Sequence, residues 1–94
     1  MTTKAEKRHM DRVADLGCYM CHRLGHGQTP AQLHHLREGQ GMGQRASNWL
    51  VVPLCEAHHA NYSKDGWHGG RKAWKREQVT EMDALEWTIE RLLA

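Results

Sequence analysis

The sequence lacks the residues from which a large apolar core is usually built: it contains no phenylalanine, and hydrophobic residues make up only 39% of its 94 positions. A chain of this length is expected to fold as a single domain, residues 1–94, close to the lower size limit for independent folding. Small domains with thin cores usually depend on a metal ion, disulfides or a partner chain for stability. The composition therefore directs attention to candidate metal ligands.

Other absences exclude whole classes of protein. The longest aliphatic run, Leu50–Val52, is far too short to cross a bilayer, so no membrane partner is expected. Residues 1–12 are charged and contain no apolar stretch, so we expect no secretory signal and a cytoplasmic protein with reduced thiols. The three cysteines are an odd number and cannot all be paired in disulfides within one chain.

Histidine is abundant, whereas the net charge is small. The formal net charge of +2 at pH 7 is compatible with a nucleic-acid partner but does not by itself indicate one. Eight histidines in 94 residues are unusual. Because histidine is the commonest metal ligand and titrates closest to neutral pH, metal binding and proton transfer are both candidate roles.

Local signals predict helices at both ends of the chain. Thr3 and Glu6 have the spacing of a capping box, which predicts a helix over residues 4–16, and Gly17 is placed to end it in a left-handed conformation. A basic helical segment is expected over 71–77. Thr80 is then placed to cap a final helix. The apolar positions of that helix are expected to pack on the core: Leu85, Ile89, Leu92 and Leu93.

The middle of the chain predicts two short strands and a helix. Residues 32–36 and the apolar residues 50–54 are expected to form strands, joined by a glycine-rich loop over 37–47. A short helix is expected over 56–62. The order strand, strand, helix, with histidines at both junctions, is the most informative part of the sequence.

The cysteines have the spacing of a structural zinc site. Cys18-x-x-Cys21 and Cys55-x-x-His58 form two pairs, and a two-residue gap lets both ligands of a pair reach one ion. The pattern uses every cysteine, and closing the intervening loop on zinc would stabilise a thin core. Free thiols in a reducing compartment are the alternative interpretation.

The same segment also matches a haem-attachment pattern. Cys18 to His22 has the form C-x-x-C-H. Haem attachment takes place outside the cytoplasm, and a small c-type cytochrome would leave Cys55 and His58 without a role. The zinc interpretation is therefore preferred.

Two adjacent histidine pairs lie next to the predicted strands. Neighbouring side chains point to opposite faces of a strand and lie about 100° apart on a helix, so the members of each pair must differ in role. In His34–His35, one member can hold a metal while the other reaches a water. In His58–His59, the second member faces away from the cysteines if the first faces toward them. We expect an open metal site separate from the zinc site; ordinary core or surface histidines are the alternative.

The combined motifs resemble those of a known nuclease family. The order C-x-x-C, His34-His35, Asn48, Cys55-x-x-His58-His59 resembles zinc-supported HNH nucleases. From Gly17 to about Trp74 the sequence is more specifically similar to the phage Ref family of recombination-enhancing, RecA-dependent nucleases. That similarity rests on Gly17-Cys18-x-x-Cys21, His34-His35, Gly41-Met42-Gly43-Gln44-Arg45-Ala46-Ser47, Pro53-Leu54-Cys55 and His68-x-Gly70-Arg71-Lys72-x-Trp74.

The resemblance implies a fold and an activity. The fold would be small α+β, with a zinc-stapled ββα-metal (HNH) core flanked by N- and C-terminal helices. The activity would be that of a metal-dependent endonuclease that hydrolyses DNA phosphodiester bonds. The protein would have phage or prophage ancestry. DNA and a RecA filament would be its partners. A structural Zn²⁺ and a catalytic divalent ion, Mg²⁺, Zn²⁺ or Mn²⁺, would be its cofactors.

The resemblance also assigns roles to single residues. His34 and His59 would hold the catalytic metal, with His68 as a further ligand candidate. His35 would be the general base, and Asn48 would orient that base or complete the site. A neutral imidazole with a pKa near ~6.5 can take a proton from water at neutral pH. The metal would polarise the phosphate and stabilise the departing oxyanion.

Basic residues near these motifs are candidates for contacts with the DNA backbone. They are Arg45, Arg71, Lys72, Lys75 and Arg76. Trp67 and Trp74 lie among them and are expected to belong to the core rather than to stack on bases. The alternative function is a non-catalytic zinc-ribbon module that binds DNA or protein. Such a module has no need for the second set of histidines.

Overall fold

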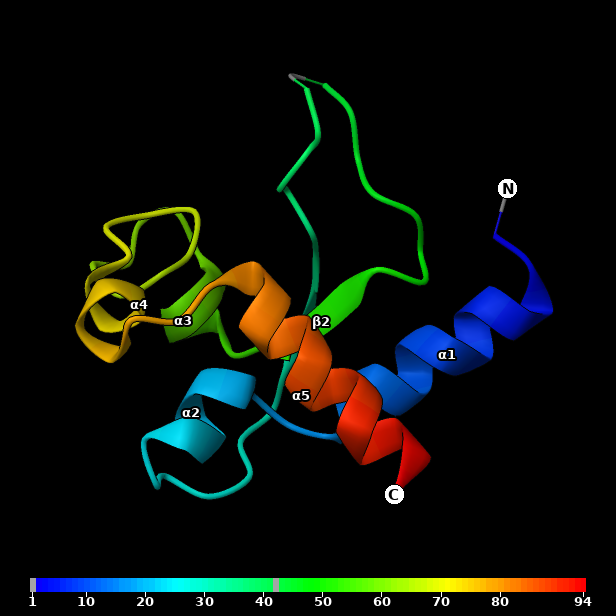
Figure 1. Cartoon of the computed structure of the whole chain (residues 1–94), viewed down its shortest axis with the longest axis horizontal. Helices are drawn as coiled ribbons and strands as arrows, with labels where there is room; N and C mark the ends of the chain where they lie inside the picture. The colour runs from blue at the N-terminus through cyan, green and yellow to red at the C-terminus, as the bar shows by residue number, and fades with distance from the viewer. Residues whose placement is uncertain (1, 42) are drawn as a thin grey trace.

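Residues 2–41 and 43–94 are described by a computed structural model, in which helices surround a two-stranded antiparallel sheet (Figure 1). In chain order the elements are α1 (Lys4–Asp15), α2 (Tyr19–Arg23), β1 (Gln32–His35), β2 (Val51–Leu54), α3 (Glu56–His59), α4 (Lys72–Glu77) and α5 (Glu81–Leu93). The prediction of a small α+β protein is confirmed. Met42, which belongs to the glycine-rich motif of the resemblance, lies outside the described residues.

Strands β1 and β2 lie at the centre of the protein. They pair in antiparallel register, with His34 opposite Val52 and His35 opposite Val51. All four residues of β2 are buried, whereas β1 buries only His34 and leaves its neighbours at least partly exposed. Each strand is one residue shorter than predicted. Helix α3 follows β2 after a single residue, so the strand pair and this helix form one continuous unit.

Helix α1 begins at the predicted capping box. Thr3 Oγ1 accepts a hydrogen bond from the backbone N–H of Glu6 at 3.1 Å. The carboxylate of Glu6 accepts a hydrogen bond from the backbone N–H of Thr3 at 3.3 Å. After the helix, Gly17 has a left-handed φ of +82°. A Cβ atom at Gly17 would also lie 2.6 Å from Cγ of Gln28, so the position has no space for a side chain. Val13 is fully buried, and α1 packs against β2 and α5.

Helix α3 ends at His59, whereas the sequence predicted a helix over 56–62. The chain turns back instead, and its backbone N–H groups bond to the end of α3. Trp67 N–H donates to the carbonyl oxygen of His58 at 2.9 Å. His68 N–H donates to the carbonyl oxygen of His59 at 3.1 Å. These bonds replace the next helical turn and hold His68 beside α3.

The buried face of α5 differs from the one that its apolar spacing predicted. Leu85 is 8% exposed, but Ile89 and Leu93 are 45% and 81% exposed, so the prediction that these two belong to the core is wrong. The buried residues of α5 are Glu81, Ala84, Leu85 and Thr88. The small side chain of Ala84 allows close packing. Glu81 points inward, where its carboxylate accepts hydrogen bonds from His34 of β1 and from the backbone N–H of Arg37.

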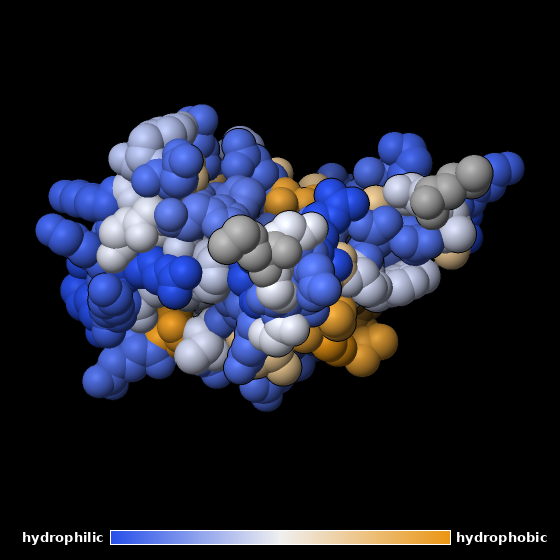
Figure 2. All heavy atoms as spheres, turned by 90° about the horizontal axis from the view of Figure 1, so that it is seen from above, coloured by the Kyte–Doolittle hydropathy of each residue, from blue (hydrophilic) through white to orange (hydrophobic). Residues whose placement is uncertain are grey.

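The hydrophobic core lies where α2, α4 and α5 meet the sheet. Its members include Tyr19, Met20, Leu54, Trp74 and Ala84. Trp74 is therefore a core residue, as predicted, whereas Trp67 is only partly buried at the edge of the core. The face shown in Figure 2 is largely hydrophilic, with hydrophobic side chains confined to small areas. None of the described helices is both long and apolar enough to cross a membrane.

Candidate metal centres

Three cysteines and one histidine meet between α2 and α3. Cys18 is the N-cap residue of α2, and Cys21 lies within that helix. Cys55 is the N-cap residue of α3, and His58 is the third residue of α3. The Sγ atoms of Cys21 and Cys55 are 3.6 Å apart, and His58 Nδ1 lies 3.6 Å from Cys21 Sγ. The same nitrogen lies 3.1 Å from Cys55 Sγ and 3.7 Å from Cys18 Sγ. Usual zinc bond lengths give tetrahedron edges of about 3.5–3.8 Å, so most of these separations match a zinc site.

Burial makes this cluster unfavourable for charge unless a cation is bound. Burial raises the pKa of the Cys18 thiol to about 12, and it also raises the pKa of Cys21. Burial likewise lowers the pKa of His58, which keeps the imidazole neutral. A divalent metal would compensate the thiolates and bind the neutral imidazole. The cluster can thus hold a metal such as zinc, and its three cysteines are free of disulfides.

Three histidines form a second cluster on the other side of α3. His34 comes from β1, His59 is the last residue of α3, and His68 lies in the segment that turns back. Their ring centres are 5.0, 5.0 and 4.9 Å apart, so the rings form a nearly equilateral triangle. One ring nitrogen from each residue lies within 4.8 Å of the others. The three histidines and the cysteine cluster form two separate groups, as the sequence predicted.

Hydrogen bonds leave one nitrogen free on two of these rings. His59 Nδ1 lies 2.9 Å from the amide oxygen of Gln32, which can only accept, so Nδ1 carries the proton and Nε2 is free. His34 Nε2 lies 2.5 Å from Oε2 of Glu81. The other nitrogen of this ring, His34 Nδ1, is buried and has no hydrogen-bond partner among the described residues. A free nitrogen on a buried ring beside two other imidazoles is suited to a metal ion.

The local environment keeps two of the three imidazoles neutral. Burial, together with charge repulsion from neighbouring His34 and His68, lowers the pKa of His59 to about 4. Burial also lowers the pKa of His68, with contributions from His34 and from nearby arginines. At pH 7 these two rings are therefore neutral imidazoles with one unprotonated nitrogen, which is the form that binds a metal.

His35 and Asn48 form a separate pair. His35 Nε2 lies 2.9 Å from Asn48 Oδ1, and Asn48 Nδ2 donates to Glu6 of α1 at 2.8 Å. Because neighbouring residues of a strand point to opposite faces, His35 faces away from the cluster that contains His34. The carboxylate of Glu6 can only accept, so the amide of Asn48 is oriented with its oxygen toward His35. His35 then carries its proton on Nε2 and leaves Nδ1 free to accept one.

Residues 2–93 match the model of a protein family described as "Recombination enhancement, RecA-dependent nuclease". The chain belongs to this family. The match covers nearly the entire chain and confirms the resemblance found from the sequence motifs. No curated protein and no solved structure shows significant similarity to it.

The basic residues of this family member fall into two groups. All five that the sequence indicated for DNA contacts are exposed: Arg45, Arg71, Lys72, Lys75 and Arg76. The last four lie on α4 or directly before it, whereas the first lies on the loop between the two strands. The structure therefore brings four of them together and leaves the fifth on a different part of the chain.

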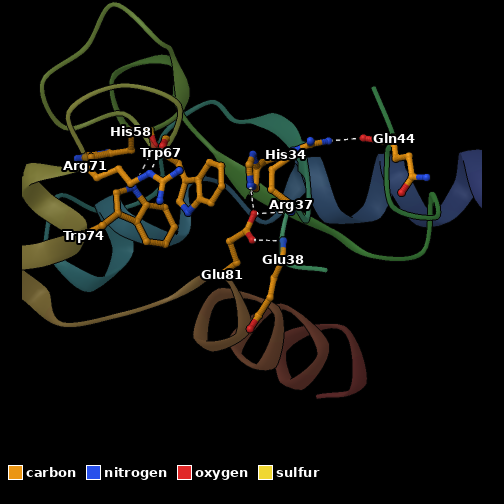
Figure 3. A network of polar contacts seen from close by, with 9 residues as sticks. All are labelled: His34, Arg37, Glu38, Gln44, His58, Trp67, Arg71, Trp74 and Glu81. Carbon is orange, nitrogen blue, oxygen red and sulfur yellow. Dashed lines mark hydrogen bonds and ion pairs between the residues drawn. The ribbon is translucent and has the colours of Figure 1, made fainter. Parts of the chain in front are cut away.

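A cleft of about 530 Å³ lies between the α4 group and Glu81, the residue that contacts His34. Arg71 and Lys75 line it together with Trp67 and Glu81. The guanidinium carbon of Arg71 lies 3.8 Å from the centre of a Trp67 ring. Trp67 also lies beside His34, whose ring centre is 4.9 Å away (Figure 3), and beside His68, whose ring centre is 5.2 Å away. Positive charge at this edge therefore lies next to the three imidazoles.

Two residues that contact the histidine cluster, Glu81 and Gln32, were not predicted from the sequence to be part of the site. Glu81 is the first residue of α5, where an acidic side chain is common because it interacts favourably with the helix dipole. Nothing local therefore distinguishes it from an ordinary helix-capping acid. Gln32 offers a weak signal, since it lies two positions before His34 and shares its face of β1.

Proposed function

We propose that the chain is a metal-dependent endonuclease of the HNH type that hydrolyses DNA phosphodiester bonds. The observation that carries this proposal is the triangle of His34, His59 and His68, with ring nitrogens within 4.8 Å of one another. The triangle is built on an antiparallel strand pair followed at once by a helix, which is the element order of a ββα-metal core. Membership of a RecA-dependent nuclease family supports a nucleic-acid-cleaving role for it.

The two clusters would have different functions. In the cysteine cluster, four protein side chains would complete the tetrahedral shell of a structural Zn²⁺ and leave no position for substrate. This zinc would join α2 to α3 and support residues 1–94 as one domain. The histidine cluster supplies only three side chains, so a divalent ion there would keep open positions for water or phosphate. Imidazole ligands suit Zn²⁺ or Mn²⁺, and Mg²⁺ remains a candidate because nucleases often use it.

The chain's own residues would divide the work of hydrolysis. His35 would accept a proton from the attacking water at Nδ1, because Asn48 holds the proton of the ring on Nε2. His34, His59 and His68 would hold the metal. When bound, that ion would supply Lewis-acid stabilisation of the phosphate and of the leaving oxygen.

The basic residues would hold the DNA backbone beside this site. Arg71 and Lys75 line a cleft with Trp67 and Glu81, both of which contact His34, and Lys72 and Arg76 extend the basic edge along α4. Arg45 would contact the backbone from the loop between the strands. Contacts to phosphate position DNA without reading its sequence, so the choice of cutting site would come from a partner such as a RecA filament.

A cleavage assay with matched variants tests this proposal. Zinc-replete protein is incubated with supercoiled plasmid and with single-stranded DNA, with and without added Mg²⁺ or Mn²⁺ and with and without RecA filaments. We expect cleavage that His59→Ala and His34→Ala both abolish, and their combination to cost little more, because residues that act as a unit are not additive. His26→Ala removes an exposed histidine outside both clusters and is expected to retain activity.

The assay also separates the proposal from a binding module. Wild-type protein that binds DNA but cleaves no substrate under any of these conditions would favour the non-catalytic zinc-ribbon interpretation. Cleavage that survives both histidine substitutions would remove the histidine cluster from the mechanism.

A further inference from the structure

A buried carboxylate lies directly behind the histidine cluster. Glu81 of α5 is 4% exposed, and its Oε2 lies 2.5 Å from Nε2 of His34 (Figure 3). The two residues are far apart in sequence and meet because α5 packs against β2, the strand that pairs with β1. Burying a carboxylate is costly unless it is paired and hydrogen-bonded, so this arrangement needs an explanation.

The backbone after β1 holds the carboxylate in one orientation. Arg37 N–H donates to Oε2 at 2.8 Å, and Glu38 N–H donates to Oε1 at 2.9 Å. Together with His34, three donors converge on the two oxygens of Glu81. Because two backbone N–H groups fix the orientation of the carboxylate, the carboxylate in turn fixes the orientation of the His34 ring.

This orientation determines the state of His34. A carboxylate can only accept, so the proton of the neutral ring lies on Nε2 and the lone pair lies on Nδ1. Nδ1 is the buried atom that has no hydrogen-bond partner among the described residues. It belongs to the ring that lies 5.0 Å, centre to centre, from both His59 and His68.

We propose that Glu81 is a positioning residue of the metal site: it accepts a hydrogen bond from the Nε2–H of His34, keeps the proton of the ring on Nε2 and thereby makes Nδ1 the metal-binding atom. This inference rests on the proposed metal site of the preceding section. A hydrogen bond from a ligand histidine to a carboxylate fixes the orientation of the ring and increases its basicity toward the metal. Through Glu81, the C-terminal helix becomes part of the site although it supplies no ligand.

A metal titration with matched variants tests the role of Glu81. Protein whose cysteine cluster is filled with zinc is titrated with Co²⁺, and binding to the histidine cluster is followed by calorimetry and by visible absorption. Glu81→Gln keeps the size of the side chain but cannot accept hydrogen bonds at both terminal atoms. We expect it to lower the Co²⁺ affinity by about 10–100-fold. Glu86→Gln, the same change at an exposed position of α5, should leave the affinity unchanged.

A double-mutant cycle separates positioning from general support of the fold. If Glu81 acts through His34, Glu81→Gln should have almost no further effect on Co²⁺ affinity in a His34→Ala background. In a His68→Ala background it should retain its full effect, because His34 is still present. Equal losses in both backgrounds would show that Glu81 only supports the fold.

The tautomer of His34 can be observed without any substitution. Nitrogen NMR of the metal-free histidine cluster should show a proton on Nε2 and none on Nδ1. A proton on Nδ1 would overturn the inference, even if the Glu81 variants failed to fold. An unchanged Co²⁺ affinity in folded Glu81→Gln would overturn it while leaving the proposed nuclease intact. Wild-type protein that binds no Co²⁺ at this cluster would overturn both proposals.

Discussion

The amide of Asn48 holds the ring of His35 at a distance of 2.9 Å between Oδ1 and Nε2. The amide is itself oriented by Glu6, whose pKa is lowered chiefly by the hydrogen bond from Asn48. This chain of contacts joins α1 to β1, the strand that carries His34 and His35. It leaves His35 Nδ1 as the nitrogen that can accept a proton.

His35→Ala is expected to lower the single-turnover cleavage rate by about 10²–10⁴-fold, which is the usual cost of losing a general base. Fold, zinc content and DNA affinity should be retained, because the ring lies outside both metal clusters. Asn48→Ala should cause a smaller loss, since it only releases the ring. Asn61→Ala, at an exposed asparagine, is the control. A fully active His35→Ala protein would reassign the base.

Loss of the zinc at the cysteine cluster should unfold the protein. Elemental analysis is expected to find about one tightly bound zinc per chain held by the cysteine cluster. Cys55→Ala or strong chelation should abolish the cooperative thermal transition followed by circular dichroism, because structural zinc supplies folding free energy directly. A well-folded sample that contains no zinc would contradict this expectation.

DNA binding should be weak, independent of sequence and strongly dependent on salt. Each of Lys72→Ala, Lys75→Ala and Arg76→Ala should weaken binding to all sequences and reduce the slope of log affinity against log salt by about one. Lys7→Ala on α1 is the control, because α1 is not part of the basic edge. Affinities are measured on mixed-sequence single- and double-stranded DNA at several salt concentrations. Tight binding to one duplex sequence that survives moderate salt would instead indicate a sequence-specific module.

Substitutions at two aliphatic residues of α5, Leu85 and Ile89, should differ in their effect on the free energy of unfolding. Leu85 is 8% exposed and packs in the core, so Leu85→Ala should cost about 2–5 kcal/mol. Ile89 is 45% exposed, so Ile89→Ala should cost less than about 1 kcal/mol. Urea unfolding measures both. Equal costs would show that α5 is rotated toward the face that its apolar spacing predicted.

Much of the local structure could be predicted from the sequence. The capping box at Thr3, the cap at Thr80 and the left-handed Gly17 were predicted correctly. Each of these features depends on contacts between residues within a few positions of one another, so it can be predicted from the local sequence. The same is true of the cysteine pairs, because two ligands separated by two residues can reach one ion without any knowledge of the fold.

The histidine cluster depended on the tertiary structure. Sequence spacing indicated that His34 and His35 would face opposite sides of a strand, but not which of them would join His59. The hydrogen bonds that end α3 bring His68 back to the cluster, and they form between backbone groups that carry no sequence signal. The rotation of α5, which buries Glu81 and exposes Ile89, was likewise decided by packing. Such contacts join residues far apart in the chain, so they are determined only when the elements meet.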